Sequence, residues 1–201
     1  MSLWAVIPVK PADEGKSRLA GALPPQARER LNITLFHRTL DAVGAVLPAA
    51  NIIVISRDGA FRDAAIARGM RIITEQGHTL NGALYEAARI VGPEAMLAIS
   101  TDLPELTPDD VRALLPAADQ PGRAMTIAPD RARHGTNALF TAPAGCIPFR
   151  FGKDSFSVHL KAARDAGIEP GIITRPGLAF DLDLPEDLKL LRFRADGSLL
   201  G

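Results

Sequence analysis

The 201-residue chain has the composition of a folded protein and carries no net charge. Apolar residues make up 47% of it and charged residues 23%, and its 23 Lys and Arg balance its 23 Asp and Glu. This composition excludes a disordered chain. A net charge of zero removes the long-range attraction that most duplex-binding and membrane-surface proteins use, so any phosphate recognition must be local. The length predicts one domain over residues 1–201.

The lone cysteine and the short apolar segments predict a cytoplasmic protein. Cys146 has no second cysteine with which to form an intramolecular disulfide, which fits a reducing compartment. The apolar run at residues 3–9 is too short for a secretory signal. The longest nearly apolar stretch, residues 42–55, contains Pro48 and Asn51 and falls short of the roughly 20 residues that span a bilayer. We therefore expect binding to neither nucleic acid nor a membrane.

Short apolar runs alternate along the chain with stretches of helical period, a pattern typical of α/β folds. The expected strands are residues 3–8, 52–55, 70–74, 96–100, 124–128, 137–140, 172–174 and 178–182. The expected helices open near residues 24–25, follow a cap at Asp58, cover 79–91, open at Thr107, and cover 154–166 and 185–193. In the first helix, four apolar residues recur at spacings of four, three and four and predict a core-facing stripe: Phe36, Leu40, Val43 and Leu47.

A basic loop follows the first expected strand. It carries Lys10, Lys16 and Arg18 around Gly15, and residues 1–40 hold six Lys and Arg against three acids. Ligands of parallel α/β sheets bind outside the carboxyl ends of the strands, where such a loop can wrap a polyphosphate. The spacing matches neither a P-loop nor a dinucleotide-binding glycine motif. A loop that is merely solvated is the alternative.

Three carboxylates form a candidate metal site. Asp102 follows a buried apolar run, and Asp181 and Asp183 lie two apart in an extended segment, where period two places both on one face. Hard oxygen ligands without a nearby His or Cys favour Mg²⁺, which also binds substrate phosphates. Each acid also has a simpler interpretation, because Asp102 can form a turn with Pro104 and Asp183 can cap a helix at Pro185.

Two loops of small hydrogen-bond donors lie beside expected strand or helix starts. They are Gly135-Thr136-Asn137 and Phe151-Gly152-Lys153-Asp154-Ser155-Phe156. Backbone amides and hydroxyls in such loops can hold a small phosphorylated acid. Turn formation explains either loop equally well when it is taken alone.

Five short motifs occur in a specific order along nearly the whole chain. They are Ile7-Pro8-Val9-Lys10 with Lys16-Ser17-Arg18-Leu19, then Ser100-Thr101-Asp102-Leu103-Pro104, Gly135-Thr136-Asn137-Ala138-Leu139, Phe151-Gly152-Lys153-Asp154-Ser155-Phe156, and Asp181-Leu182-Asp183-Leu184-Pro185. Together they resemble the guanylyltransferases of coenzyme F420 biosynthesis, which act on phosphoenolpyruvate, 2-phospho-L-lactate or 3-phospho-D-glycerate. Each motif is short, so the specificity of the resemblance comes from their joint order.

The resemblance implies a fold and a set of roles. The fold is a single three-layer α/β/α nucleotidyltransferase domain, glycosyltransferase-A-like and Rossmann-related, with a mixed, mostly parallel sheet. Its implied metal ion is Mg²⁺, held by Asp102, Asp181 and Asp183, and these acids with Lys16 are the implied catalytic residues. The phosphorylated acid is assigned to Thr136, Gly152 and Ser155, the triphosphate to Lys10, Lys16 and Arg18, and the base and ribose to Glu75, Gly77 and Asn81. Arg133 stands where the family leads us to expect glycine, which leaves the acceptor open.

The expected reaction is an in-line attack by the phosphate of a small phospho-acid on the α-phosphorus of GTP, with release of diphosphate and no protein nucleophile. The alternative enzymes are a molybdenum-cofactor guanylyltransferase and a sugar-phosphate nucleotidyltransferase, although the glycine-rich first loop typical of those is absent. A nucleotide-binding module without catalysis is the non-enzymatic alternative, and the three acids argue against it. The resemblance also implies hand-over of the product to the next transferase of the F420 pathway. A homodimer is one option that no motif decides.

Overall fold

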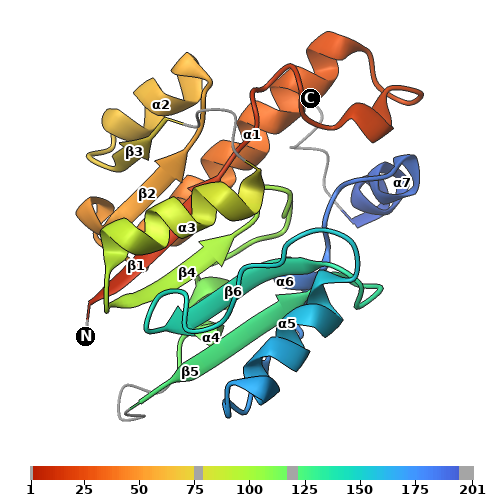
Figure 1. Cartoon of the computed structure of the whole chain (residues 1–201). Coiled ribbons are helices and arrows are strands. Elements are labelled where there is room, and N and C mark those ends of the chain that lie inside the picture. Colours follow the sequence, from red (N-terminus) through yellow and green to blue (C-terminus); the bar gives the residue numbers. More distant parts are fainter. Residues whose placement is uncertain (1, 75–78, 117–121, 195–201) are drawn as a thin grey trace.

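The computed structural model describes residues 2–74, 79–116 and 122–194. They form one mixed seven-stranded sheet with helices on both faces (Figure 1). The strands are β1 Leu3–Pro8, β2 Ile52–Ile55, β3 Arg71–Ile73, β4 Ala95–Ile99, β5 Ala124–Pro129, β6 Thr136–Ala142 and β7 Gly171–Ile172. The helices are α1 Pro25–Gly44, α2 Gly59–Ile66, α3 Leu80–Val91, α4 Pro108–Ala113, α5 Ser155–Asp165, α6 Pro176–Ala179 and α7 Pro185–Arg194, with short 3₁₀ turns η1 Ser17–Leu19 and η2 Ala49–Asn51.

The strand order β3-β2-β1-β4-β6-β5-β7 places the functional loops together. Strands β1, β2, β3 and β4 are parallel, so their carboxyl ends lie at one edge of the sheet. Strand β6 runs antiparallel to β4, with Ala138 opposite Ile99. The start of β6 therefore lies beside the carboxyl end of β4, and loops that are far apart in sequence meet there.

Apolar clusters on the two faces of the sheet make the three layers. Helices α1, α2, α4 and α6 pack on one face, where Phe36 and Phe61 are buried against alternate residues of β1, β2 and β4. Helices α3 and α5 pack on the opposite face (Figure 1). A third cluster joins η1, α1 and α7 through Leu19, Leu35 and Leu188. This cluster fixes the basic loop and the last helix to the same helix, α1.

The local signals in the sequence are confirmed at the helix starts. Asp58 caps α2 by accepting a hydrogen bond from the backbone nitrogen of Ala60 at 2.9 Å. Thr107 and Asp110 form a reciprocal capping box at the start of α4. The predicted stripe is buried throughout, with Phe36, Leu40 and Val43 in α1 and Leu47 after its end at Gly44. Most boundaries of the seven strands lie within one residue of the prediction.

The strand predicted at residues 178–182 is wrong. Pro176 begins the short helix α6, and the chain then continues outside the sheet. The alternation that suggested a strand is real, because Leu178, Phe180 and Leu182 are all buried. The backbone nitrogen of Leu182, however, donates to the carbonyl oxygen of Asp102 at 2.9 Å, so this segment is held by a loop rather than by a neighbouring strand.

Among the described residues, no helix combines the length and the apolar character needed to cross a membrane.

We predict that Gly177→Ala destabilises the protein by about 1–3 kcal/mol, because overpacking forces backbone shifts. A β-carbon at Gly177 would lie 2.7 Å from the carbonyl oxygen of Glu105 and closer still to the carboxylate of Asp110. Urea unfolding measures the change. The matched control is Gly59→Ala, whose added carbon meets no atom within 4 Å. An unchanged midpoint for Gly177→Ala would contradict the tight contact of α6 with α4.

Candidate active site

A cavity of about 670 Å³ opens at the carboxyl ends of β1, β2 and β4. The basic loop, the first turns of α3, the start of β6 and the segment before α7 contribute to its walls. Its polar lining includes Lys10, Lys16, Arg18, Asp102, Thr136 and Asp183. The structure therefore brings together predicted nucleotide, metal and acceptor residues from four separate segments of the chain.

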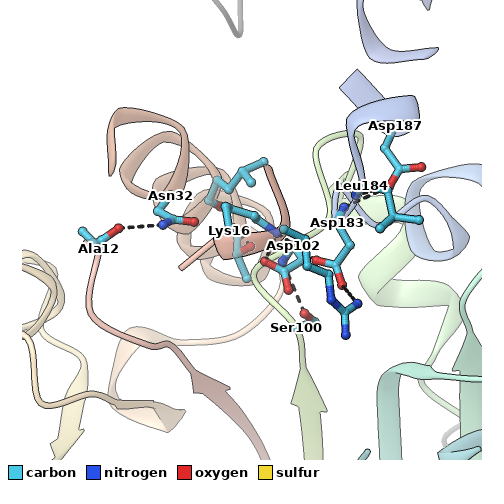
Figure 2. A network of polar contacts seen from close by, with 11 residues as sticks. Ala12, Lys16, Asn32, Ser100, Asp102, Asp183, Leu184 and Asp187 are labelled. Carbon is cyan, nitrogen blue, oxygen red and sulfur yellow. Dashed lines mark hydrogen bonds and ion pairs between the residues drawn. The ribbon is translucent and has the colours of Figure 1, made fainter. Parts of the chain in front are cut away.

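Lys16 is the buried cation of this cavity. Its backbone is left-handed, with φ of 56°, and it caps the turn η1, whose Leu19 is buried in the cluster with α1 and α7. Its side chain is only 2% exposed. The ammonium donates to the carboxylate of Asp102 and lies 3.4 Å from Oδ1 of Asp183 (Figure 2). One charge thus joins the end of β4 to the segment before α7.

Helix α1 anchors the basic loop through the side chain of Asn32. Asn32 donates from Nδ2 to the carbonyl oxygen of Ala12 at 2.7 Å (Figure 2). A β-carbon at Gly15 would lie 2.8 Å from Cγ of Asn32, so any larger residue would push the Asn32 amide from its place. The backbone nitrogen of Ala12 also donates to the cap residue Asp58 at 3.0 Å. These contacts fix the loop that places the Lys16 ammonium.

The carboxylate of Asp183 faces the cavity and does not cap helix α7. Asp187, inside the first turn of α7, accepts from the backbone nitrogens of Asp183 and Leu184 at 3.0 and 2.7 Å (Figure 2). The Asp183 carboxylate is left to pair with Lys16 and, at 3.4 Å, with Nη1 of Arg18. The simple capping interpretation of Asp183 is therefore wrong.

Asp181 lies outside this group, since it is not among the described residues that line the cavity. Burial, together with repulsion from Asp183, Asp130 and Asp187, raises the pKa of its carboxyl to about 6. The structure thus places Asp181 in an acidic environment beside the site. Its predicted role as a metal ligand stays a prediction.

The pair of Asp102 and Asp183 fits a hard divalent cation. Their carboxylates already converge on one cationic atom, Nζ of Lys16, and their side chains are 39% and 37% exposed. Within residues 2–74, 79–116 and 122–194, no group of three or more His, Cys, Asp or Glu is gathered as a metal site. Because Mg²⁺ is commonly held by one or two carboxylates plus substrate phosphates and water, two protein ligands are enough for an ion that shares its ligands with a nucleotide.

The remaining predicted nucleotide residues have mixed outcomes. Lys10 is exposed at the cavity wall, and the Arg18 side chain is 70% exposed. The side chain of Asn81 is engaged with the backbone of Phe151, accepting from its nitrogen at 2.8 Å and donating to its oxygen at 3.1 Å. This double hydrogen bond gives Asn81 a structural task, and its contact with the nucleotide stays a prediction. Glu75 and Gly77 lie outside the described residues.

The predicted acceptor residues meet at the start of α5. Ser155, the first residue of this helix, has its Oγ 3.1 Å from Oγ1 of Thr136, the first residue of β6. Gly152 has a φ of 134°, a left-handed conformation that favours glycine, and its carbonyl oxygen accepts from the backbone nitrogen of Ser155 at 3.2 Å. Of these three residues, only Thr136 is among the described residues that line the cavity, and Ser155 is 1% exposed and lies behind it. We call the part of the lining formed by Thr136 the acceptor wall.

Arg133 has a backbone conformation that usually favours glycine. Its φ of 59° is left-handed, which is the physical reason to expect glycine at this position. Its guanidinium lies 4.9 Å from the centre of the Phe156 ring, a cation–π contact that favours the observed placement. Arg133 is not among the described residues that line the cavity.

Three contributors were missed in the sequence. Asn32 carries no signal in a single sequence, and His159 stands out only as the residue one helical turn after Ser155. Asp187 does have a signal, because an acid in the first turn of a helix often accepts from the backbone before it. The spacing of motifs predicted the charged and hydroxyl residues of the cavity but not the side chains that hold them in position.

Comparison with known proteins identifies the family. A sequence model of the protein family described as guanylyl transferase CofC-like matches residues 3–198 of this chain. The chain belongs to this family. It is 42% identical over 203 residues to a phosphoenolpyruvate guanylyltransferase of Rubrobacter xylanophilus, covering 99% of this chain and 97% of the relative. It is 37% identical to one of Chloroflexus aggregans, covering 91% and 93%.

A solved structure confirms the fold. A nucleotide-diphospho-sugar transferase-like protein of Desulfovibrio desulfuricans G20 superposes with a TM-score of 0.77 at 19% identity, over 98% of this chain and 90% of that chain. The family assignment makes the protein a guanylyltransferase, which takes a nucleoside triphosphate and a phosphorylated substrate. The two alternative transferases and the non-catalytic module are thereby set aside.

We predict that Lys16→Met lowers diphosphate release at least about 100-fold, because it removes a preorganised cation from a buried site. Turnover and urea unfolding are measured together, so that loss of the site is distinguished from loss of the fold. The matched control is Lys161→Met, on an exposed α5 side chain paired with Asp165. A Lys16→Met enzyme with more than a third of normal turnover would contradict the role of Lys16.

A second prediction concerns pH. Burial lowers the pKa of His159 to about 4 from 6.5, so the folded state needs the neutral ring. Its contribution to stability is complete above pH 6.5 and is lost as the pH falls towards 4, by up to about 3 kcal/mol. The raised pKa of Asp181 acts in the opposite direction, so the difference in unfolding free energy between wild type and His159→Gln is the informative quantity. A difference that stays constant between pH 7 and 4 would contradict the assignment.

Proposed function

We propose that this enzyme transfers GMP from GTP to the phosphate of phosphoenolpyruvate and releases diphosphate. The acceptor is the one for which the relatives of Rubrobacter xylanophilus and Chloroflexus aggregans are named. The observation that carries the proposal is the cavity itself, which Lys16, Asp102 and Asp183 line together with Thr136. A buried cation with two carboxylates suits a nucleotide triphosphate, and hydroxyl donors suit a small phosphorylated acid.

The reaction joins two phosphates. An oxygen of the phosphoenolpyruvate phosphate forms a bond to the α-phosphorus of GTP, and the bond from that phosphorus to the oxygen bridging to the β-phosphorus breaks. Diphosphate leaves with the bonding electrons, and guanosine and enolpyruvate remain joined through a new diphosphate. The acceptor is already an anion near neutral pH, so no protein nucleophile and no general base is needed.

The main barrier is repulsion between two anions, and the side chains of the cavity act on it. Lys16 is held at a fixed position by Asp102 and Asp183, so it does not reorganise when negative charge develops. Arg18, which is exposed beside Asp183, and Lys10 supply further positive charge at the mouth of the cavity. Orientation of both substrates then converts their encounter into an in-line attack.

Asp102 and Asp183 are the residues proposed to hold Mg²⁺, and Asp181 is the third candidate. When bound there, the ion would neutralise phosphate charge and favour departure of diphosphate. Thr136, Gly152 and Ser155 are proposed to hold the acceptor, and Arg133 is the place to seek a difference in acceptor choice. A cytoplasmic location, a homodimer and hand-over of the product to the next F420 enzyme are further parts of the proposal.

The direct test measures diphosphate release for GTP, ATP, CTP and UTP, each with phosphoenolpyruvate, 2-phospho-L-lactate and 3-phospho-D-glycerate. We expect the highest kcat/KM for GTP with phosphoenolpyruvate. A higher value with another acid would overturn the acceptor. No release with GTP and any of the three acids would overturn the proposed function.

We also predict that Asp102→Asn and Asp183→Asn each lower Mg²⁺-dependent turnover at least about 100-fold, because an amide is a poor ligand for a hard cation. The control is Asp109→Asn, on an exposed carboxylate that pairs with Arg112 on α4. Near-normal turnover of both cavity variants would remove the metal assignment. Asp181→Asn, tested in parallel, decides whether the third acid belongs to the site.

A further inference from the structure

His159 connects the buried side of α5 to the acceptor wall of the cavity. It has no exposed surface, and both ring nitrogens have partners. Nε2 lies 2.9 Å from the backbone nitrogen of Arg150, and Nδ1 lies 3.1 Å from Oγ1 of Thr136. The ring of Phe151 meets it edge to face, with 5.0 Å between centres. The imidazole is therefore fixed in position by three neighbours.

The backbone of Arg150 determines which nitrogen of His159 carries the hydrogen. A backbone N–H only donates, so Nε2 must accept from it. A neutral imidazole has one donor and one acceptor nitrogen. The hydrogen is consequently on Nδ1, which donates to Oγ1 of Thr136. The low pKa of the ring agrees with a neutral state near pH 7.

This tautomer decides what the two hydroxyls can offer a ligand. His159, Thr136 and Ser155 contribute three polar hydrogens, and two hydrogen bonds join them. One hydroxyl hydrogen is therefore left over. Thr136 lines the cavity, whereas Ser155 is 1% exposed and lies behind it. When Ser155 donates to Thr136, the hydrogen left over belongs to the cavity-lining hydroxyl.

The opposite tautomer would reverse this outcome. If Nδ1 were the acceptor, Thr136 would donate to His159 and Ser155 would donate to Thr136. Both hydroxyl hydrogens would then be consumed, and the wall would present only lone pairs, which repel an anion. The polarity of the acceptor wall thus depends on a buried ring that lies behind the cavity lining.

We propose that His159 is a positioning residue that keeps the Thr136 hydroxyl as a hydrogen-bond donor to an anionic oxygen of the phosphorylated acid. This inference rests on the proposed function for the identity of that acid. His159 does not touch the substrate. It acts through Thr136, and its effect is on binding of the acid rather than on binding of the nucleotide.

Two substitutions distinguish the role of Nδ1 from that of Nε2 in His159. His159→Asn can place an amide donor near the position of Nδ1 and leaves Arg150 without a partner. His159→Gln can place an amide oxygen near the position of Nε2 and leaves Thr136 without a donor. We expect KM for phosphoenolpyruvate to rise about tenfold or more in the Gln variant and to stay within about threefold of wild type in the Asn variant. KM for GTP should change less than about twofold in both.

A double variant tests whether the effect passes through Thr136. Thr136→Val removes the hydroxyl and should raise KM for phosphoenolpyruvate as much as His159→Gln does. Adding His159→Gln to Thr136→Val should then cause no further rise, because the two residues act as one unit. A multiplicative rise, a Gln variant that equals wild type, or equal damage in the Gln and Asn variants would overturn the proposal.

The tautomer can be tested without turnover. ¹⁵N NMR of the wild-type imidazole rings, with the His159 signals assigned by their loss in His159→Gln, shows which nitrogen carries the hydrogen. We expect hydrogen on Nδ1 and none on Nε2 near pH 7. Hydrogen on Nε2 would overturn the inference even in an active enzyme. If wild type does not react with phosphoenolpyruvate, the proposed function fails, while the NMR result still decides the polarity of the hydroxyl pair.

Discussion

The buried ammonium of Lys16 is the contact on which the rest of the site depends. It pairs with the carboxylate of Asp102, after β4, and with that of Asp183, before α7. Without this cation between them, the two carboxylates would repel each other. Desolvation cancels much of the energy of a buried ion pair, so such a pair is weak support for stability. Here the ion pairs fix the positions of the Lys16 ammonium and the two carboxylates. A left-handed residue, a glycine packed against Asn32 and a buried leucine all serve to hold one charge in place.

The sheet order then brings two chemically different sets of side chains to the cavity. The carboxyl ends of parallel strands supply the basic loop and Asp102, and the antiparallel strand β6 supplies Thr136 beside them. The zero net charge of the chain therefore conceals a local grouping, in which cations and acids gather in the cavity beside the neutral hydroxyl of Thr136. Such a cavity suits one nucleotide and one small acid better than a long polyanion, because its charges are confined to a single concave surface.

The sequence predicted those parts of the structure that follow from local rules. Strand and helix order, the caps at Asp58 and Thr107, the stripe of α1 and the convergence of the basic loop with Asp102 all arise from spacing and strand direction. The strand expected at 178–182 failed because alternation reports burial and not pairing, and Pro176 starts a helix instead. The separation of Asp181 from Asp183, the clamp between Asn81 and Phe151, and the ring of His159 depend on contacts between distant segments. No spacing in one sequence encodes them.

In the proposed reaction, an acceptor phosphate attacks the α-phosphorus of the nucleotide inside this cavity. The most direct measurement uses phosphoenolpyruvate whose phosphate oxygens are labelled with ¹⁸O, and follows the label by ³¹P NMR after one turnover with GTP. We expect the label to appear in the new diphosphate of the product, including its bridging oxygen, and none in the released diphosphate. Label in the released diphosphate, or a product whose bridging oxygen is unlabelled, would contradict it.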